Sequence, residues 1–178
     1  MAGDMFHLSA FLPYRLAVLS ERVSRRLSAV YMQSHGLTVA EWRVLVHLRR
    51  RGKVSVRDIH ECVNLEKPRV SRAVSRLEAD GLVRKIAGQE DARLVEISLT
   101  ARGLAALGEI LPAVTAIEAR LLAALTREEA DMFFAVMEKL HATLDADPEA
   151  KMRSPMDLDP PTKVHRTSLE ADIERTAS

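Results

Sequence analysis

The sequence has little of what disulfide-stabilised or membrane-spanning proteins need. Cys62 is the single cysteine, so no disulfide can form within the chain, which is typical of proteins from a reducing compartment. No apolar run approaches the roughly 18 residues of a membrane span, and the N-terminus lacks a signal-peptide pattern. We therefore expect a cytoplasmic protein with no membrane partner.

Patterns that carry catalysis or bind metals are also scarce. The chain has only seven glycines, and it contains no phosphate-cradling glycine loop, no G-x-S-x-G and no H-E-x-x-H. Six histidines lie at positions 7, 35, 47, 60, 141 and 165, and none pairs with Cys, Asp or Glu at a zinc-ligand spacing. We predict no catalytic residue, no metal site and no cofactor.

What the chain does contain favours helix and an uneven distribution of charge. Among its 178 residues 47% are hydrophobic but only 4% aromatic, and Ala, Leu, Arg and Glu are abundant. Residues 38–103 carry 14 Lys and Arg against 9 Asp and Glu, whereas residues 104–178 carry 8 against 14. A basic middle followed by an acidic C-terminal part is typical of a DNA-facing module attached to another region, although a basic stretch can also be only a solvated surface.

The basic middle contains a helical pattern with two distinct faces. Apolar residues at 70, 73, 74 and 77 follow the i, i+3, i+4, i+7 spacing of one buried helix face. The outward positions hold Arg69, Ser71, Arg72, Ser75 and Arg76, a basic face without bulky apolar groups. Pro68 suits the first turn of this helix and Gly81 suits the turn that follows it. Such a face can enter a DNA major groove.

A β-hairpin is predicted directly after this helix. Residues 82–86 and 94–99 are short β-like runs, and the second alternates apolar and polar side chains. The sequence AGQEDAR connects them. Before the basic helix, Ser55-Val56-Arg57-Asp58 resembles a capping box that opens a short helix through Ile59 and Val63. The order is therefore helix, short turn, basic helix and hairpin, as in a winged helix-turn-helix.

The run LEKPRVSRAVSRLEADGLVRK, followed by Asp91-Ala92-Arg93 and by LTARG at 99–103, resembles the MarR family of bacterial transcriptional regulators. The resemblance implies that Asp91 holds Arg93 toward the DNA minor groove. It also implies double-stranded DNA as a partner. Arg69 departs from the small residue that many members carry there, so its contact is left unassigned, and we expect it to behave like a phosphate contact. The predicted DNA-binding residues are Lys67, Arg69, Ser71, Arg72, Ser75, Arg76, Lys85, Asp91 and Arg93.

Long amphipathic helices are predicted on both sides of the basic module. From Phe11 to about Ser34, apolar residues recur every three or four positions, and Thr38–Glu41 forms a capping box for a helix that contains Trp42, which we assign to the core. Thr100 opens a long helix that Pro112 should kink, and Thr126–Glu129 caps a last one. One small chain cannot bury all these apolar faces, so we expect a homodimer, which the family resemblance also implies.

We therefore expect a mainly α fold with a small β-hairpin wing, in which a winged helix-turn-helix lobe is joined to a helical dimerisation region. The predicted divisions are 1–37 for the N-terminal dimerisation helix, 38–103 for the DNA-binding lobe, 104–145 for the C-terminal dimerisation helices and 146–178 for a polar, flexible tail. The tail contains four of the seven prolines.

The most favoured function is a homodimeric repressor of a pseudo-palindromic operator, released by a small ligand. The resemblance implies aromatic acids or acyl thioesters as ligand classes, and Tyr14, Arg15 and Arg22 are the candidate ligand-binding residues, although each also suits a solvated or dimer-contact role. Two alternatives stay open. One is a thiol redox sensor that uses Cys62, and the other is a winged-helix protein-interaction module without specific DNA binding.

Overall fold

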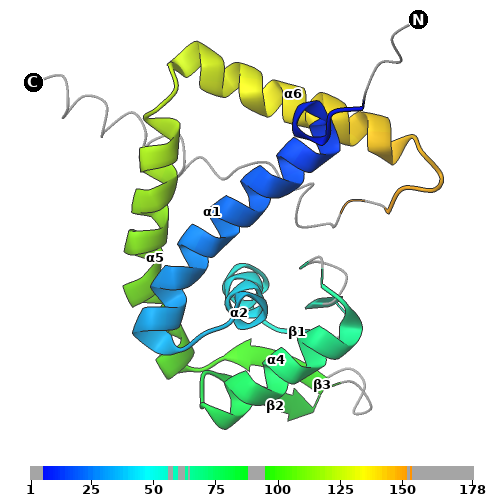
Figure 1. The fold of residues 1–178 in the computed structure, drawn as a ribbon. Coiled ribbons are helices and arrows are strands. Elements are labelled where there is room, and N and C mark those ends of the chain that lie inside the picture. The colour runs from blue at the N-terminus through cyan, green and yellow to red at the C-terminus, as the bar shows by residue number, and fades with distance from the viewer. Residues whose placement is uncertain are drawn as a thin grey trace, which may run out of the picture.

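The computed structural model describes residues 6–55, 58, 59, 63, 65–87, 95–151 and 153. Over these residues the chain is mainly helical with one small antiparallel sheet, which confirms the expected fold class (Figure 1). In chain order the elements are η1 (Leu8–Ala10), α1 (Leu12–His35), α2 (Val39–Arg51), β1 (Val54–Ser55), α4 (Lys67–Ala79), β2 (Val83–Ala87), β3 (Val95–Leu99), α5 (Ala101–Leu122) and α6 (Arg127–Asp145).

Two of the capping boxes expected from the sequence start their helices, α2 and α6, as predicted. In α2 the Thr38 side chain accepts from the Glu41 amide while the Glu41 carboxylate accepts from the Thr38 amide, and Thr126 and Glu129 do the same at α6. The Asp58 carboxylate accepts from the Ser55 amide, and the Ser55 hydroxyl accepts from the Asp58 amide, while most of the short helix predicted after this pair lies outside the described residues. These local contacts satisfy amides that a helix N-terminus leaves without a partner.

The sheet has one strand more than the sequence predicted. Strands β2 and β3 form the expected hairpin, with Val83 opposite Leu99 and Ala87 opposite Val95. The two-residue strand β1 pairs with the other edge of β3, where Val54 lies opposite Ile97, so the strand order is β1-β3-β2. Two residues are too few to show an alternating pattern, and for this reason the sequence did not reveal β1.

One hydrophobic core joins α2, α4 and the sheet to the adjoining ends of α1 and α5. Its members are buried apolar residues from each of these elements, among them Leu45, Val70, Leu77, Ile97 and Leu107. At the edge of this core the Tyr31 ring of α1 stacks on the Trp42 ring of α2, with 5.2 Å between ring centroids. Trp42 is half-buried and packs against this core from its edge, whereas the sequence assigned it to the core itself. We call the compact region from residue 38 to 103 the winged lobe.

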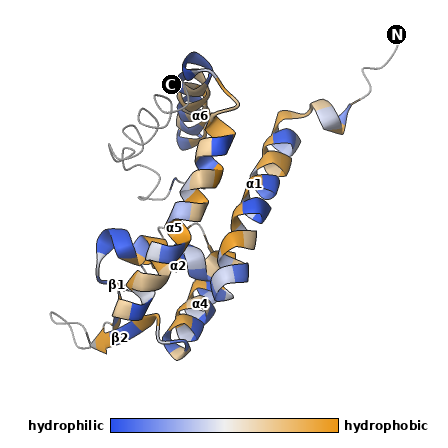
Figure 2. Ribbon diagram, turned by 90° about the vertical axis from the view of Figure 1, so that its left-hand side faces the viewer, coloured by the Kyte–Doolittle hydropathy of each residue, from blue (hydrophilic) through white to orange (hydrophobic). Residues whose placement is uncertain are grey.

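Two helical segments stand away from this core. Helix α5 leaves the winged lobe, continues through Pro112 and leads to α6 at the far end of the molecule (Figure 1). The N-terminal end of α1 crosses α6 in that view, but the two helices lie apart when the molecule is turned by 90° (Figure 2). We call α6 and the N-terminal half of α1 the helical arms. None of the described helices combines the length and the hydrophobicity of a membrane-spanning segment.

Candidate nucleic-acid interface

Helix α4 presents a basic face on the surface of the winged lobe. Its buried residues are Val70, Ala73, Val74 and Leu77, the four that the helical spacing predicted. Pro68 lies in the first turn, where a missing backbone N–H has no cost. Gly81, just beyond the helix, has a φ of 69°, a conformation that favours glycine. The exposed residues of α4 include all its predicted DNA contacts, Lys67, Arg69, Ser71, Arg72, Ser75 and Arg76.

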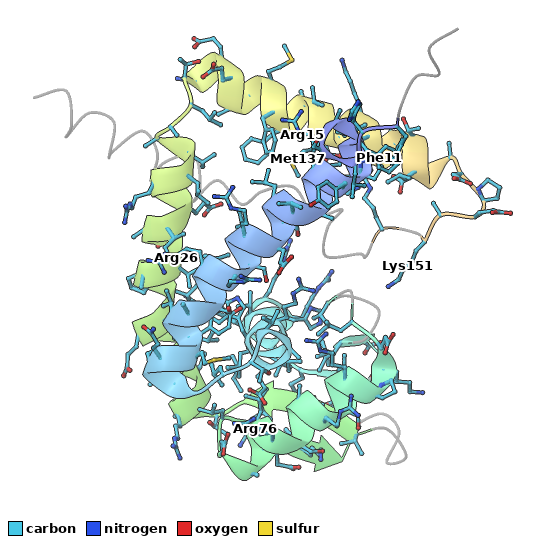
Figure 3. The ribbon with its side chains drawn as sticks, in the orientation of Figure 1. Phe11, Arg15, Arg26, Arg76, Met137 and Lys151 are labelled. Carbon is cyan, nitrogen blue, oxygen red and sulfur yellow. The ribbon has the colours of Figure 1, made fainter. Side chains whose placement is uncertain are left out.

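The three arginines of this face differ in their surroundings. Arg69 and Arg72 are exposed and have no ion pair with any of the described residues. Arg76, which is labelled on α4 in Figure 3, forms an ion pair with α2, because its Nε lies 3.4 Å from Oε1 of Glu41. The Glu41 side chain is 4% exposed, whereas that of Arg76 is 58% exposed. Arg76 is therefore anchored at one side of its guanidinium and remains open to solvent at the other.

A tight joint holds the end of α4 against the start of α5. The Thr100 hydroxyl donates to the Gly81 carbonyl oxygen at 2.7 Å and accepts from the Gly103 amide at 3.0 Å. The Thr100 amide donates to the Leu82 carbonyl oxygen. Gly103 approaches so closely that a Cβ there would lie 2.1 Å from this same oxygen. The LTARG sequence thus fixes the turn between the basic helix and the hairpin.

Of the three predicted DNA contacts on the hairpin, only Lys85 is among the described residues. The Lys85 ammonium forms a 2.6 Å ion pair with Glu78 of α4, which connects the hairpin to the end of the basic helix. At the preceding position of β2, the Nε of Arg84 donates a hydrogen bond to the hydroxyl of Ser98 on the paired strand β3. Asp91 and Arg93 lie outside the described residues, so the wing-tip assignment stays a prediction.

The lobe also buries a titratable ring in α2. His47 in α2 is 1% exposed. Burial, followed by the nearby cations of Arg51 and Arg50, lowers the pKa of His47 below its ordinary value of 6.5, while Asp58 opposes this shift. The neutral ring is therefore favoured in the folded lobe. Burial likewise raises the pKa of the Tyr31 hydroxyl, against the opposing effect of Arg43.

The candidate ligand-binding residues lie on the helical arm formed by α1. Tyr14, Arg15 and Arg22 are all exposed, and a spacing of seven residues places the two arginines on the same side of the helix. Across the part of the chain that the structure describes, no three His, Cys, Asp or Glu side chains gather as metal ligands do. Cys62 lies outside the described residues.

Sequence reasoning found Glu41 as a helix cap but missed its contact with Arg76. The two residues are 35 positions apart, so no local spacing could reveal the pair. The roles of Thr100 and Gly103 in the α4–α5 joint were missed for the same reason, since their partners Gly81 and Leu82 belong to another element. The signal was present only as the LTARG sequence.

Comparison with known proteins agrees with this geometry. The model of the MarR family matches residues 35–94. The HTH-type transcriptional repressor MdtR of Bacillus subtilis is 30% identical over 122 residues, which cover 68% of this chain and 79% of MdtR. Among solved structures, a MarR/EmrR family transcriptional regulator from Acinetobacter sp. ADP1 superposes with a TM-score of 0.71 at 25% identity, covering 80% of this chain and all of that one.

A second solved structure adds a relative whose regulation has been studied. This structure is of Bordetella bronchiseptica BpsR, whose DNA binding is regulated by 6-hydroxynicotinic acid. The two chains are 26% identical and superpose with a TM-score of 0.59, and the match covers 71% of this chain and 98% of that one. The sequence match, the winged lobe and its exposed basic helix lead to the same conclusion. This chain belongs to the MarR family of winged helix-turn-helix, DNA-binding transcriptional regulators.

Proposed function

We propose that this protein is a homodimeric repressor that binds a pseudo-palindromic operator and is released by a small aromatic acid or an acyl thioester. The observation that carries the proposal is the exposed face of α4, where arginine and serine side chains lie on the side of the helix opposite its four buried apolar residues. One such helix enters the major groove of each half-site. Residues 38–103 form the DNA-binding unit.

Dimer formation is supported by the helical arms. Of the 19 residues of α6, Ala130 alone is buried, and Phe133, Met137, Leu140 and Leu144 line one side of the helix in solvent. In Figure 3, Phe11, which directly precedes α1, and Met137 on α6 are labelled near the point where the two helices cross, yet these helices lie apart in Figure 2. A second copy would bury both arms, so segments 1–37 and 104–145 are the proposed dimerisation regions.

Repression and release by a ligand are supported by the relatives. MdtR is named a transcriptional repressor, and DNA binding by BpsR is regulated by 6-hydroxynicotinic acid, a small aromatic acid. Tyr14, Arg15 and Arg22 offer an aromatic ring and two guanidiniums that suit the ring and carboxylate of such a molecule. They remain the proposed ligand contacts.

The wing tip is proposed to contact the minor groove through Arg93, with Asp91 orienting the guanidinium. The sign of one substitution tests this. Asp91→Ala removes a negative charge, so simple electrostatics would predict tighter binding to DNA. If Asp91 orients Arg93, the variant binds the operator more weakly, and Arg93→Ala lowers the salt dependence of binding by about 0.9 in log–log slope per wing. Tighter binding by Asp91→Ala would contradict the assignment.

Footprinting on a duplex selected by the protein from a random library tests the main proposal. We expect two protected half-sites about 10 base pairs apart, because two recognition helices must face the same side of the duplex. Light scattering should give twice the 19.8 kDa mass of the chain. Addition of 6-hydroxynicotinic acid and related aromatic acids or thioesters should then remove the footprint. A monomer, or a chain that selects no sequence, would contradict the proposal.

A further inference from the structure

Two capping boxes in this chain have nearly the same geometry. At α2 the Thr38 amide donates to Oε2 of Glu41 at 2.7 Å, and the Glu41 amide donates to the Thr38 hydroxyl at 3.3 Å. At α6 the Thr126 amide donates to Oε2 of Glu129 at 2.8 Å, and the reverse bond is 3.2 Å long. As helix caps, the two glutamates are therefore equivalent.

The two glutamates differ in burial and in ion pairing, neither of which a helix cap requires. Glu129 is exposed and forms no ion pair with a described residue. Glu41 is buried, and its second oxygen, Oε1, faces Nε of Arg76 on the exposed face of α4. The carboxylate thus serves two elements with two different oxygens. One oxygen caps α2, and the other holds a side chain of the basic helix.

Because the ion pair involves Nε of Arg76, the two outer nitrogens of the guanidinium can still bind another group. A guanidinium carries five N–H donors in a planar fork, and the contact with Glu41 uses its Nε side. Its outer nitrogens stay available to a partner, in agreement with the 58% exposure of the side chain. Arg72 has no such anchor among the described residues. An arginine that is already oriented loses less conformational entropy when it binds than one that is not.

We infer that Glu41 is a positioning residue for DNA recognition, which orients Arg76 so that its outer nitrogens meet a base edge in the operator. The inference rests on the proposed function, because it assigns a role within operator recognition. Glu41 itself does not touch DNA. Its burial keeps the carboxylate away from the phosphates, and the Thr38 amide together with the Arg76 guanidinium offsets the cost of burying the charge.

The test compares Glu41→Gln with Glu129→Gln. Glutamine keeps an oxygen that can accept the capping bond, so both variants retain their helices, but glutamine has no charge with which to hold Arg76. Binding is measured on the duplex that the wild type selects from a random library and on a scrambled duplex of the same composition. The quantity compared is the ratio of the two affinities.

We expect Glu41→Gln to lower this ratio by about 2- to 10-fold, the gain that ordering one long side chain in advance provides, while Glu129→Gln leaves it unchanged. In an Arg76→Ala background, Glu41→Gln should have no further effect on the ratio. Equal losses on both duplexes, a similar loss in Glu129→Gln, or an undiminished effect in the Arg76→Ala background would each overturn the inference. A purely structural role would not produce a change confined to the selected duplex.

An NMR measurement on the DNA-free dimer separates failure of the inference from failure of the proposed function. The Nε–Hε signal of Arg76 should be resolved and slow to exchange in the wild type, and it should weaken in Glu41→Gln but not in Glu129→Gln. A signal that Glu41→Gln leaves unchanged overturns the inference even where operator binding is normal. A wild type that selects no DNA sequence overturns the proposed function and the recognition role together, while the NMR signal still reports the ion pair.

Discussion

The winged lobe and the helical arms contain helices of similar amphipathic character, but only the lobe buries its apolar faces within one chain. Helix α4 has 13 residues and buries four, whereas α6 has 19 residues and buries one. Phe133 and Phe134 are 44% and 50% exposed, while Leu77 and Ile97 in the lobe are fully buried. The apolar faces of α2 and α4 are therefore covered by their own chain, together with the adjoining ends of α1 and α5, whereas the apolar side of α6 is exposed in a single chain.

The largest effect is expected from breaking the arms while sparing the lobe. Phe133→Asp combined with Leu140→Asp places charges on the apolar side of α6, and a two-fold interface contains each change twice. Each buried apolar side chain contributes about 1.5–3 kcal/mol, so the dimer dissociation constant should rise by about 1000-fold or more. Sedimentation velocity measures the change, and the fluorescence of Trp42 checks that the lobe stays folded.

Lys139→Glu is the matched control, because it adds acidic charge to the opposite, polar side of the same helix. It should dimerise like the wild type. If the double variant also does so, the apolar side of α6 does not form the interface.

The next largest effect is expected on the stability of the lobe, at the joint between the end of α4 and the start of α5. Gly103→Ala would bring a Cβ to 2.1 Å from the Leu82 carbonyl oxygen, so the turn after α4 must shift. We expect a loss of about 3 kcal/mol in the free energy of unfolding of the lobe. Urea unfolding followed by Trp42 fluorescence measures it, since Trp42 is the only tryptophan of the chain and lies in the lobe.

Gly108→Ala, five residues later in α5, has the opposite expectation. Nothing lies within 4 Å of a Cβ at this position, and alanine favours helix over glycine by up to about 1 kcal/mol. The two substitutions are chemically identical, so a difference in sign isolates the contact with Leu82. Equal effects would mean that the turn after α4 adapts without cost.

A smaller and more selective effect is expected on DNA binding. Arg72→Ala removes a guanidinium from the centre of the exposed face of α4, and operator binding should weaken by about 1–3 kcal/mol with little change on random DNA. Arg127→Ala at the start of α6 is a control, because it removes the same group from an arm. Fluorescence anisotropy with both duplexes measures the effect. Equal weakening on operator and random DNA would assign Arg72 to phosphate.

The smallest effect is expected in the pH dependence of the free energy of unfolding of the lobe, where His47 is buried. The pKa of His47 is lowered in the folded lobe, so below its ordinary value of 6.5 the unfolded chain binds a proton that the folded lobe resists. The contribution of the neutral His47 ring to the free energy of unfolding is fully present above pH 6.5, and it is lost as the pH falls toward the lowered pKa of the folded state. Urea unfolding at several pH values should show the loss in the wild type and a flatter profile in His47→Leu. A profile unchanged by this substitution would assign the loss to other groups.

In the lobe and in the arms, features that depend on local spacing could be predicted from the sequence. The i, i+3, i+4, i+7 pattern of α4 identified its four buried residues, and Thr38–Glu41 and Thr126–Glu129 identified the helix starts, because such contacts join residues within one or two turns. The β2–β3 hairpin followed from two short runs close together in sequence. The exposed basic face of α4 followed in the same way, as the complement of its buried face.

Contacts between elements that are distant in sequence could not be predicted and are seen only in the folded chain. The strand β1, the approach of Gly103 to Leu82 and the ion pair of Glu41 with Arg76 each depend on how whole helices and strands pack, which no local pattern records. The separation of α6 from α1 was also visible only in three dimensions, since an amphipathic helix has the same sequence pattern whether its apolar face is covered by its own chain or by a second copy.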